Sequence, residues 1–149
     1  MSAPIIAQSR LKLDVKHAVL ARVAASSAWF LTRLPPHAVC RVLTVVIKGA
    51  GPADPAKVSY WRGAINSVST RCAGNGCLQR SVAVVLLARF FGTAPTWRTG
   101  FRPDPFVAHA WVEAEGVAVD EPQAVTHFHV VLEVAPTIAS DNSENEVRA

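Results

Sequence analysis

The stretch from Cys77 to Phe91 constrains the fold more than any other part of the sequence, because it is apolar on nearly every side of a helical wheel. A helix without a polar face is stable only where other elements cover it all round. Gly92 follows directly, and glycine readily takes the left-handed conformation that ends a helix. The sequence therefore predicts a central, buried helix over 77–91, with Cys77 in its first turn.

Three helices are predicted before this central one, from apolar residues that recur at helical spacing. Two prolines at positions 35 and 36 end the first, a glycine- and proline-rich segment over 49–52 ends the second, and Pro55 opens the third. The Gly-Asn-Gly composition within residues 71–76 is typical of a loop. The predicted helices cover residues 15–33, 37–48 and 57–68.

The second half of the chain has the short apolar runs of β-strands. Glu115 and Gly116 fit the two central positions of a tight hairpin turn. Helices followed by a small antiparallel sheet give an α+β fold, in which the helical N-terminal half packs on the sheet. The predicted strands cover residues 96–101, 108–114, 117–120 and 126–134.

A single folded domain is expected over residues 15–138. The chain has 149 residues, of which 50% are hydrophobic and 17% are charged, so it is large enough to bury a core and too apolar to be disordered. We divide the domain into a helical subregion over 15–70 and a second subregion over 71–138. Residues 1–14 are expected to be an N-terminal extension, and the polar segment over 139–149 a disordered tail.

Charge and cysteine content limit the class of partner and the compartment. A net charge of +4 suits an acidic peptide or protein as well as nucleic acid, but no basic cluster is interleaved with aromatic residues, so we expect no nucleic-acid partner. Three cysteines, in a chain without a secretory signal, predict free thiols in a reducing compartment. The apolar runs fall far short of the ~20 residues of a membrane span. We therefore expect a cytoplasmic protein without a membrane partner.

Cys77 and His109 are the candidate catalytic pair. A cysteine attacks as its thiolate, and the backbone N–H groups and partial positive charge of a helix N-terminus lower the pKa of a thiol there. The same N–H groups suit the oxyanion of a tetrahedral intermediate. His109, on a predicted strand, has the type of side chain that takes and returns the proton. The structural alternatives are a buried core cysteine and a half-buried strand histidine without a partner.

An acidic residue is expected to orient the histidine. If the hairpin turn is centred on residues 115–116, strand alternation places Asp120 on the same face as His109 and diagonally across from it. A three-residue loop would reverse the parity of the second strand and present Glu121 instead. The turn residues favour the two-residue loop, so Asp120 is the expected partner and Glu121 the alternative.

Two blocks of sequence around these residues follow the pattern of a known family. Residues 77–81 (CLQRS), followed by the run 85–89 and Gly92, resemble the C-L-x-R-S block of the lasso peptide biosynthesis B2 proteins. Residues 101–106 (FRPDPF) and 109–113 (HAWVE) resemble the R-P-x-P and H-A-W-V-E motifs of the same family. The resemblance is close from about residue 71 to residue 122.

The resemblance implies a leader peptidase with a papain- or transglutaminase-like core over 71–138. Carried over residue by residue, it makes Cys77 the nucleophile, His109 the general base and acid, and Asp120 the orienting carboxylate, with Glu121 competing for the last role. It also implies three partners. These are the leader region of a precursor peptide, a separate B1 protein that recognises this leader, and the macrolactam synthetase known as the C protein.

Two further residues are expected to contact the substrate. Arg80 is expected to bind acidic side chains of the leader, for which a solvated surface arginine is the alternative. Trp111 is assigned to the substrate site beside His109, where it would shield the imidazole from water, and a tryptophan of the core is the default alternative.

Two other functions stay open on the sequence alone. One is a non-catalytic scaffold of the same fold that only docks a peptide and a partner. The other is an acyltransferase in which an amine captures the thioester on Cys77 in place of water. We expect no cofactor and no metal, because Cys72, Cys77, His127 and His129 lack the paired short spacing of closed zinc sites. Cys40 lies in an apolar helical run and is expected in the core.

Overall fold

The computed structural model describes residues 11–121 and 124–137. It combines helices with a small antiparallel sheet, so the predicted α+β class is confirmed. The tail expected over 139–149, and most of the extension expected over 1–14, lie outside the described residues. The helices are α1 (Val15–Leu31), α2 (Pro36–Val46), α3 (Pro55–Val68), α4 (Thr70–Ala73) and α5 (Cys77–Phe90). The strands are β1 (Gly51–Pro52), β2 (Thr93–Ala94), β3 (Thr96–Pro103), β4 (Phe106–Ala114), β5 (Val117–Ala118) and β6 (His129–Val134), and a 3-10 helix, η1 (Val125–His127), precedes β6.

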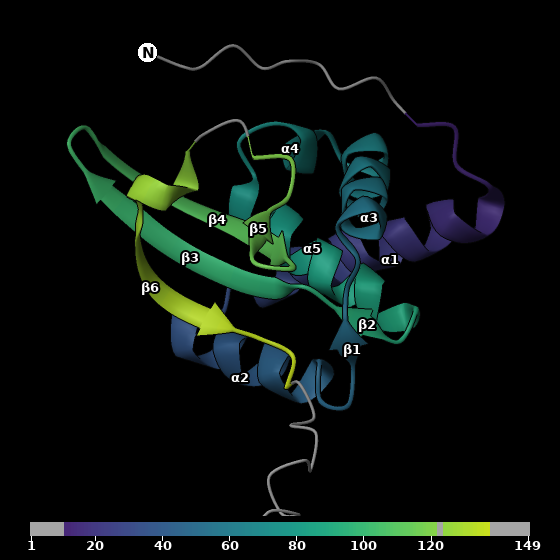
Figure 1. The fold of residues 1–149 in the computed structure, drawn as a ribbon. Helices are drawn as coiled ribbons and strands as arrows, with labels where there is room; N and C mark the ends of the chain where they lie inside the picture. The colour runs from purple at the N-terminus through teal and green to yellow at the C-terminus, as the bar shows by residue number, and fades with distance from the viewer. Residues whose placement is uncertain (1–10, 122–123, 138–149) are drawn as a thin grey trace, which may run out of the picture.

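The central helix is confirmed, because α5 packs against α1 and α3 as well as against the sheet (Figure 1). Its side chains are buried almost without interruption from Gln79 to Ala88. Gly92, at φ +79°, follows the helix in the left-handed conformation that the sequence predicts. The α1 face that meets the core consists of small side chains at helical spacing, which lets neighbouring backbones approach closely. These residues are Ala21, Ala24, Ala25 and Ala28.

α3 brings polar side chains to the inside of the molecule. It begins after Asp54, whose carboxylate accepts hydrogen bonds from the backbone N–H groups of Ala56 (2.7 Å) and Lys57 (3.3 Å) and so caps the helix. Most of its buried residues are apolar, but Arg62 is buried as well, with 4% of its surface exposed. A buried arginine needs a partner, and it finds one in the site described below.

The sheet has the strand order β5-β4-β3-β6, and all of its pairs are antiparallel. Ala114 pairs with Val117, and both turn residues have positive φ, 52° at Glu115 and 76° at Gly116. The predicted two-residue hairpin is therefore confirmed, since positive φ at both central positions is the geometry that matches the twist of the strands. β5, however, ends at Ala118 and not at residue 120.

Three local features differ from the expected elements. Residues 70–73 form the short helix α4, part of which the sequence predicts as loop. A parallel pair of two-residue strands, β1 and β2, ties the segment before α3 to the segment after α5. The expected strand over 126–134 is shorter, because η1 takes up its beginning. Among the described residues, no helix is both long and apolar enough to cross a membrane.

Candidate active site

Cys77 is the first residue of α5, as the sequence predicts. Gly76 before it is required by close packing, because a Cβ at this position would lie 2.6 Å from the backbone oxygen of Arg71. The backbone N–H groups in the first turn of a helix have no partner within the helix, and the helix dipole places partial positive charge there. Both effects favour a thiolate at this position.

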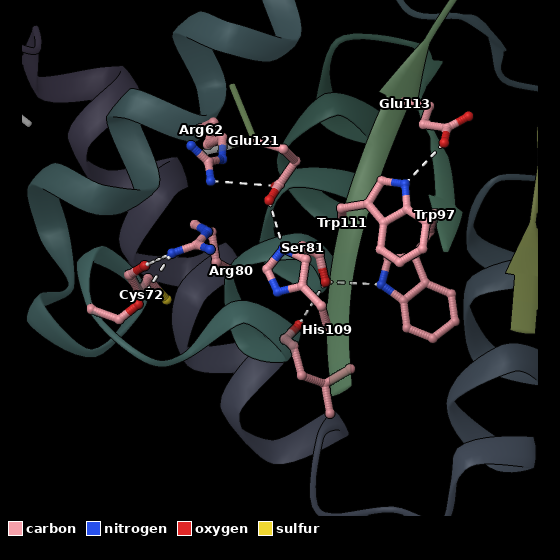
Figure 2. Close-up of polar contacts among 11 residues, drawn as sticks. Arg62, Cys72, Arg80, Ser81, Trp97, His109, Trp111, Glu113 and Glu121 are labelled. Carbon is pink, nitrogen blue, oxygen red and sulfur yellow. Dashed lines mark hydrogen bonds and ion pairs between the residues drawn. The ribbon is translucent and has the colours of Figure 1, made fainter. Parts of the chain in front are cut away.

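Arg80 holds the loop that leads to the nucleophile. Its Nη1 donates to the backbone oxygens of Cys72, at 2.7 Å, and Gly74, at 3.3 Å, and the residue is only 9% exposed (Figure 2). The expectation that Arg80 binds acidic side chains of a substrate is therefore wrong. Its donors satisfy backbone carbonyls inside the protein, and its position beside the first turn of α5 adds positive charge near Cys77.

His109, on β4, connects the thiol to a carboxylate. Its Nε2 lies 2.6 Å from Oε2 of Glu121, and the side chains of the pair are 8% and 3% exposed (Figure 2). The imidazole also interacts with the thiol of Cys77, and each group favours the charged form of the other. Because Glu121 occupies Nε2, the other ring nitrogen is left for the sulfur. Cys77, His109 and Glu121 thus lie in series, and the side chains of the last two are shielded from water.

Asp120 does not contact the histidine, which corrects the expected geometry. Its carboxylate accepts a hydrogen bond from the hydroxyl of Ser59 at 2.5 Å. The turn residues are as predicted, but Asp120 would face His109 only if the chain stayed extended up to residue 120. β5 instead ends at Ala118, the N–H of Val119 makes one more bond to the backbone oxygen of Val112 (3.1 Å), and Asp120 has a left-handed backbone with φ 52°. This bend changes the side-chain alternation, so that Glu121, the alternative acid, faces His109.

Arg62 is the ionic partner of Glu121. Its Nη2 lies 3.4 Å from Oε1 of Glu121, and the two side chains are 5% and 3% exposed. Burial and the neighbouring charge of Arg80 lower the pKa of Arg62, whereas Glu121 and Asp120 oppose this change. Neither Arg62 nor Ser59 is recognisable as a site residue in the sequence. Each lies about 60 positions from its partner, and nothing in the local pattern of α3 signals such a contact.

The electrostatic environment favours a thiolate–imidazolium pair. Burial by itself would raise the pKa of Cys77, but hydrogen bonds with His109 and the backbone of Ala110, and the charges of His109 and Arg80, outweigh it and lower that pKa. Burial likewise opposes the charged form of His109, yet its hydrogen bonds and charge interactions with Cys77 and Glu121 raise its pKa to about 9. The surroundings of the pair therefore favour a nucleophilic thiolate and an imidazolium able to donate a proton.

The other thiols have the opposite tendency. Burial raises the pKa of Cys40 and of Cys72, which is fully buried in α4. All three cysteines are free. Cys77 is thus the cysteine whose surroundings favour the reactive, ionised form.

Trp111 belongs to the core, which is the default alternative on the sequence, and not to a substrate surface. It is 1% exposed, and its indole N–H donates to Oε1 of Glu113 at 2.9 Å. Its ring lies nearly parallel to the imidazole of His109, with 6.1 Å between the ring centres. The ring centre of Phe128 lies 6.0 Å from that of the imidazole. These two rings limit the access of water to His109, so Trp111 supports the site from inside.

Comparison with known proteins places this geometry in a family. A family model described as the transglutaminase-like superfamily matches residues 21–133, which is most of the chain. The chain belongs to the transglutaminase-like superfamily. The match includes Cys77, His109 and Glu121. No curated protein and no solved structure matches the chain significantly.

Members of the transglutaminase-like superfamily are in general cysteine peptidases or acyltransferases, and the arrangement around Cys77 suits either chemistry. A metal centre is not indicated by the side chains. Within residues 11–121 and 124–137, no group of three or more His, Cys, Asp or Glu residues lies close enough together to hold an ion.

Proposed function

We propose that this chain is a cysteine peptidase that removes the leader from a lasso peptide precursor. The observation that carries the proposal is the series Cys77, His109 and Glu121, which begins at the N-terminus of α5. Membership of the transglutaminase-like superfamily supports cysteine chemistry in general. The substrate class is supported by the blocks CLQRS and HAWVE, which resemble the B2 proteins and contain the proposed nucleophile and base.

The reaction proceeds through an acyl-enzyme. The thiolate of Cys77 attacks the carbonyl carbon of the scissile bond, and backbone N–H groups in the first turn of α5 stabilise the oxyanion. The imidazolium of His109 gives its proton to the leaving amine, the C–N bond breaks, and a thioester remains on Cys77. Water then attacks the thioester while His109 takes its proton, and the departing thiolate regenerates the enzyme. Glu121 orients the ring and stabilises the imidazolium throughout.

The partners follow from the same proposal. A separate B1 protein presents the leader region of the precursor, and the released core peptide passes to the macrolactam synthetase. The three free cysteines fit a reducing compartment, so we place the reaction in the cytoplasm.

Intact-mass analysis of a precursor peptide incubated with this chain and the B1 protein tests the proposal. Wild type is expected to release an intact leader, and Cys77→Ala to release none. Cys40→Ala is the matched control, because it removes a different thiol and should cleave as wild type does. Full cleavage by Cys77→Ala would refute the nucleophile, and binding without cleavage by wild type would favour a scaffold. An amide formed with an added amine would favour acyl transfer.

A second measurement needs no partner. Iodoacetamide at neutral pH is expected to alkylate Cys77 before the other two cysteines, because its pKa alone among the three is lowered. Peptide mapping by mass identifies the modified residue. Preferential alkylation of Cys40 would contradict the proposed thiolate.

A further inference from the structure

Two consecutive acidic residues after β5 each bond to a side chain of α3. Asp120 accepts a hydrogen bond from Ser59 at 2.5 Å, and Glu121 forms its ion pair with Arg62 at 3.4 Å. Ser59 and Arg62 are three residues apart on α3, a spacing that puts both side chains on the same face of a helix. α3 therefore meets the acid-bearing segment at two adjacent points, and only Glu121 goes on to contact His109.

The backbone of Asp120 decides which carboxylate reaches the histidine. In a continued strand, residues 120 and 121 would point to opposite faces, with Asp120 on the side of His109. The left-handed conformation at Asp120, φ 52°, breaks this alternation. Residues with a Cβ avoid that conformation unless their surroundings hold it, and Asp and Asn tolerate it best. The hydrogen bond from Ser59 is the interaction that holds it here.

We propose that Ser59 is a positioning residue: by bonding to Asp120, it maintains the turn that presents Glu121 to His109. Arg62 is the second attachment point and acts directly on Glu121. Neither side chain takes part in bond making or breaking. The inference rests on the proposed Cys77–His109–Glu121 series and goes beyond it, because it explains why the second of the two acids is the one in use.

The titration of the His109 ring tests this inference without a substrate. The experiment uses the full chain with 13C-labelled histidine and follows the ring signals by NMR, in wild type and in a Cys77→Ala background that removes the coupled thiol. Ser59→Ala is expected to lower the pKa of His109 by about one unit, the size expected when a single charge-assisted hydrogen bond to the ring is weakened. Ser59→Thr keeps the hydroxyl and should restore the wild-type value. The titratable and charged groups near the ring and its carboxylate partner are Cys77 and Arg80 from α5, Arg62 from α3, and Asp120 and Glu121 from the segment after β5.

The matched control is Ser67→Ala on the same helix. The hydroxyl of Ser67 donates to Gly63 within α3, and it accepts from the backbone N–H of Leu11, far along the chain from the acid segment. This variant should leave the pKa of His109 unchanged. An equal fall in Ser67→Ala and Ser59→Ala would mean a general loosening of α3 and would overturn the positioning role.

Two substitutions at Asp120 separate the hydrogen bond from the backbone conformation. Asp120→Asn keeps an acceptor for Ser59 and tolerates the left-handed backbone, so His109 should titrate as in wild type. Asp120→Gly permits that backbone but removes the acceptor, and should lower the pKa as Ser59→Ala does. An unchanged titration in both Ser59→Ala and Asp120→Gly would overturn the proposal.

The same titrations distinguish a failure of the proposed peptidase function from a failure of the positioning role of Ser59. If the chain is not a leader peptidase but the series is real, wild-type His109 still titrates near 9 and the Ser59 variants still decide the positioning role. If the wild-type ring titrates near its ordinary 6.5, the Glu121–His109 pair itself is refuted, and the positioning role is refuted with it.

Discussion

Replacing Glu121 by Gln should weaken catalysis far more than replacing Asp120 by Asn. The side chain of Glu121 is 3% exposed, and its Oε2 lies 2.6 Å from the imidazole of His109. Together with Cys77 it raises the pKa of that ring from 6.5 to about 9, which corresponds to roughly 3 kcal/mol of preference for the imidazolium. If about half of this comes from Glu121, its loss lowers kcat/KM roughly tenfold. Asp120→Asn keeps the acceptor for Ser59, so kcat/KM should stay within about twofold of wild type.

The assay is the release of leader from precursor peptide in the presence of the B1 protein, measured as kcat/KM across pH 5 to 10. The alkaline limb of the wild-type profile should fall near pH 9, where the imidazolium of His109 loses its proton. In Glu121→Gln this limb should move to lower pH, because the variant no longer places a negative charge beside the ring. A larger loss of activity in Asp120→Asn than in Glu121→Gln would refute the assignment of Glu121.

Two further predictions concern stability and are measured by urea unfolding. Gly76→Ala should destabilise the protein by about 1–3 kcal/mol, because the added Cβ would lie 2.6 Å from the backbone oxygen of Arg71 and force the loop before α5 to move. An unchanged midpoint of urea unfolding would show that this loop adapts freely. Ser81→Ala should cost about 1–3 kcal/mol, because Ser81 Oγ accepts the indole N–H of the fully buried Trp97 at 3.0 Å and the variant leaves that donor unpaired. The double variant that also carries Trp97→Phe should recover part of the loss, and no recovery would contradict the hydrogen-bond explanation.

Local patterns were sufficient to predict the central helix, the hairpin and the proximity of Cys77 and His109. α5 is recognisable because an apolar surface all round leaves burial as its only stable state. The hairpin follows from Glu115 and Gly116, which adopt the positive φ values that a two-residue turn needs. Cys77 and His109 meet because a helix N-terminus and a strand of the same small domain lie against each other.

Contacts between distant segments could not be predicted from the same patterns. Arg80 is a basic residue near the start of a helix. The sequence around it does not reveal that its guanidinium points inward and donates to the backbone carbonyls of Cys72 and Gly74. The choice of acid depends on one backbone dihedral angle at Asp120, which is held by Ser59 from a helix 61 positions earlier. The alternation of side chains along a strand is a local rule, so it does not account for a hydrogen bond between residues so far apart in the sequence.

The opposite pKa changes of Cys77 and His109 make a last prediction about stability. In wild type, folding favours the protonated imidazole and the ionised thiol, so their contributions to the pH dependence of stability oppose each other. Cys77→Ala removes the thiol and leaves the imidazole, whose folded pKa is still raised by Glu121. A raised folded pKa gives stability that is complete below about pH 6.5 and is lost as the pH rises through the folded value. The free energy of unfolding of this variant should therefore fall with rising pH by up to about 1.4 kcal/mol per unit, relative to the same curve for wild type. Parallel curves for the two proteins between pH 6 and 9 would show that the thiolate–imidazolium pair does not form.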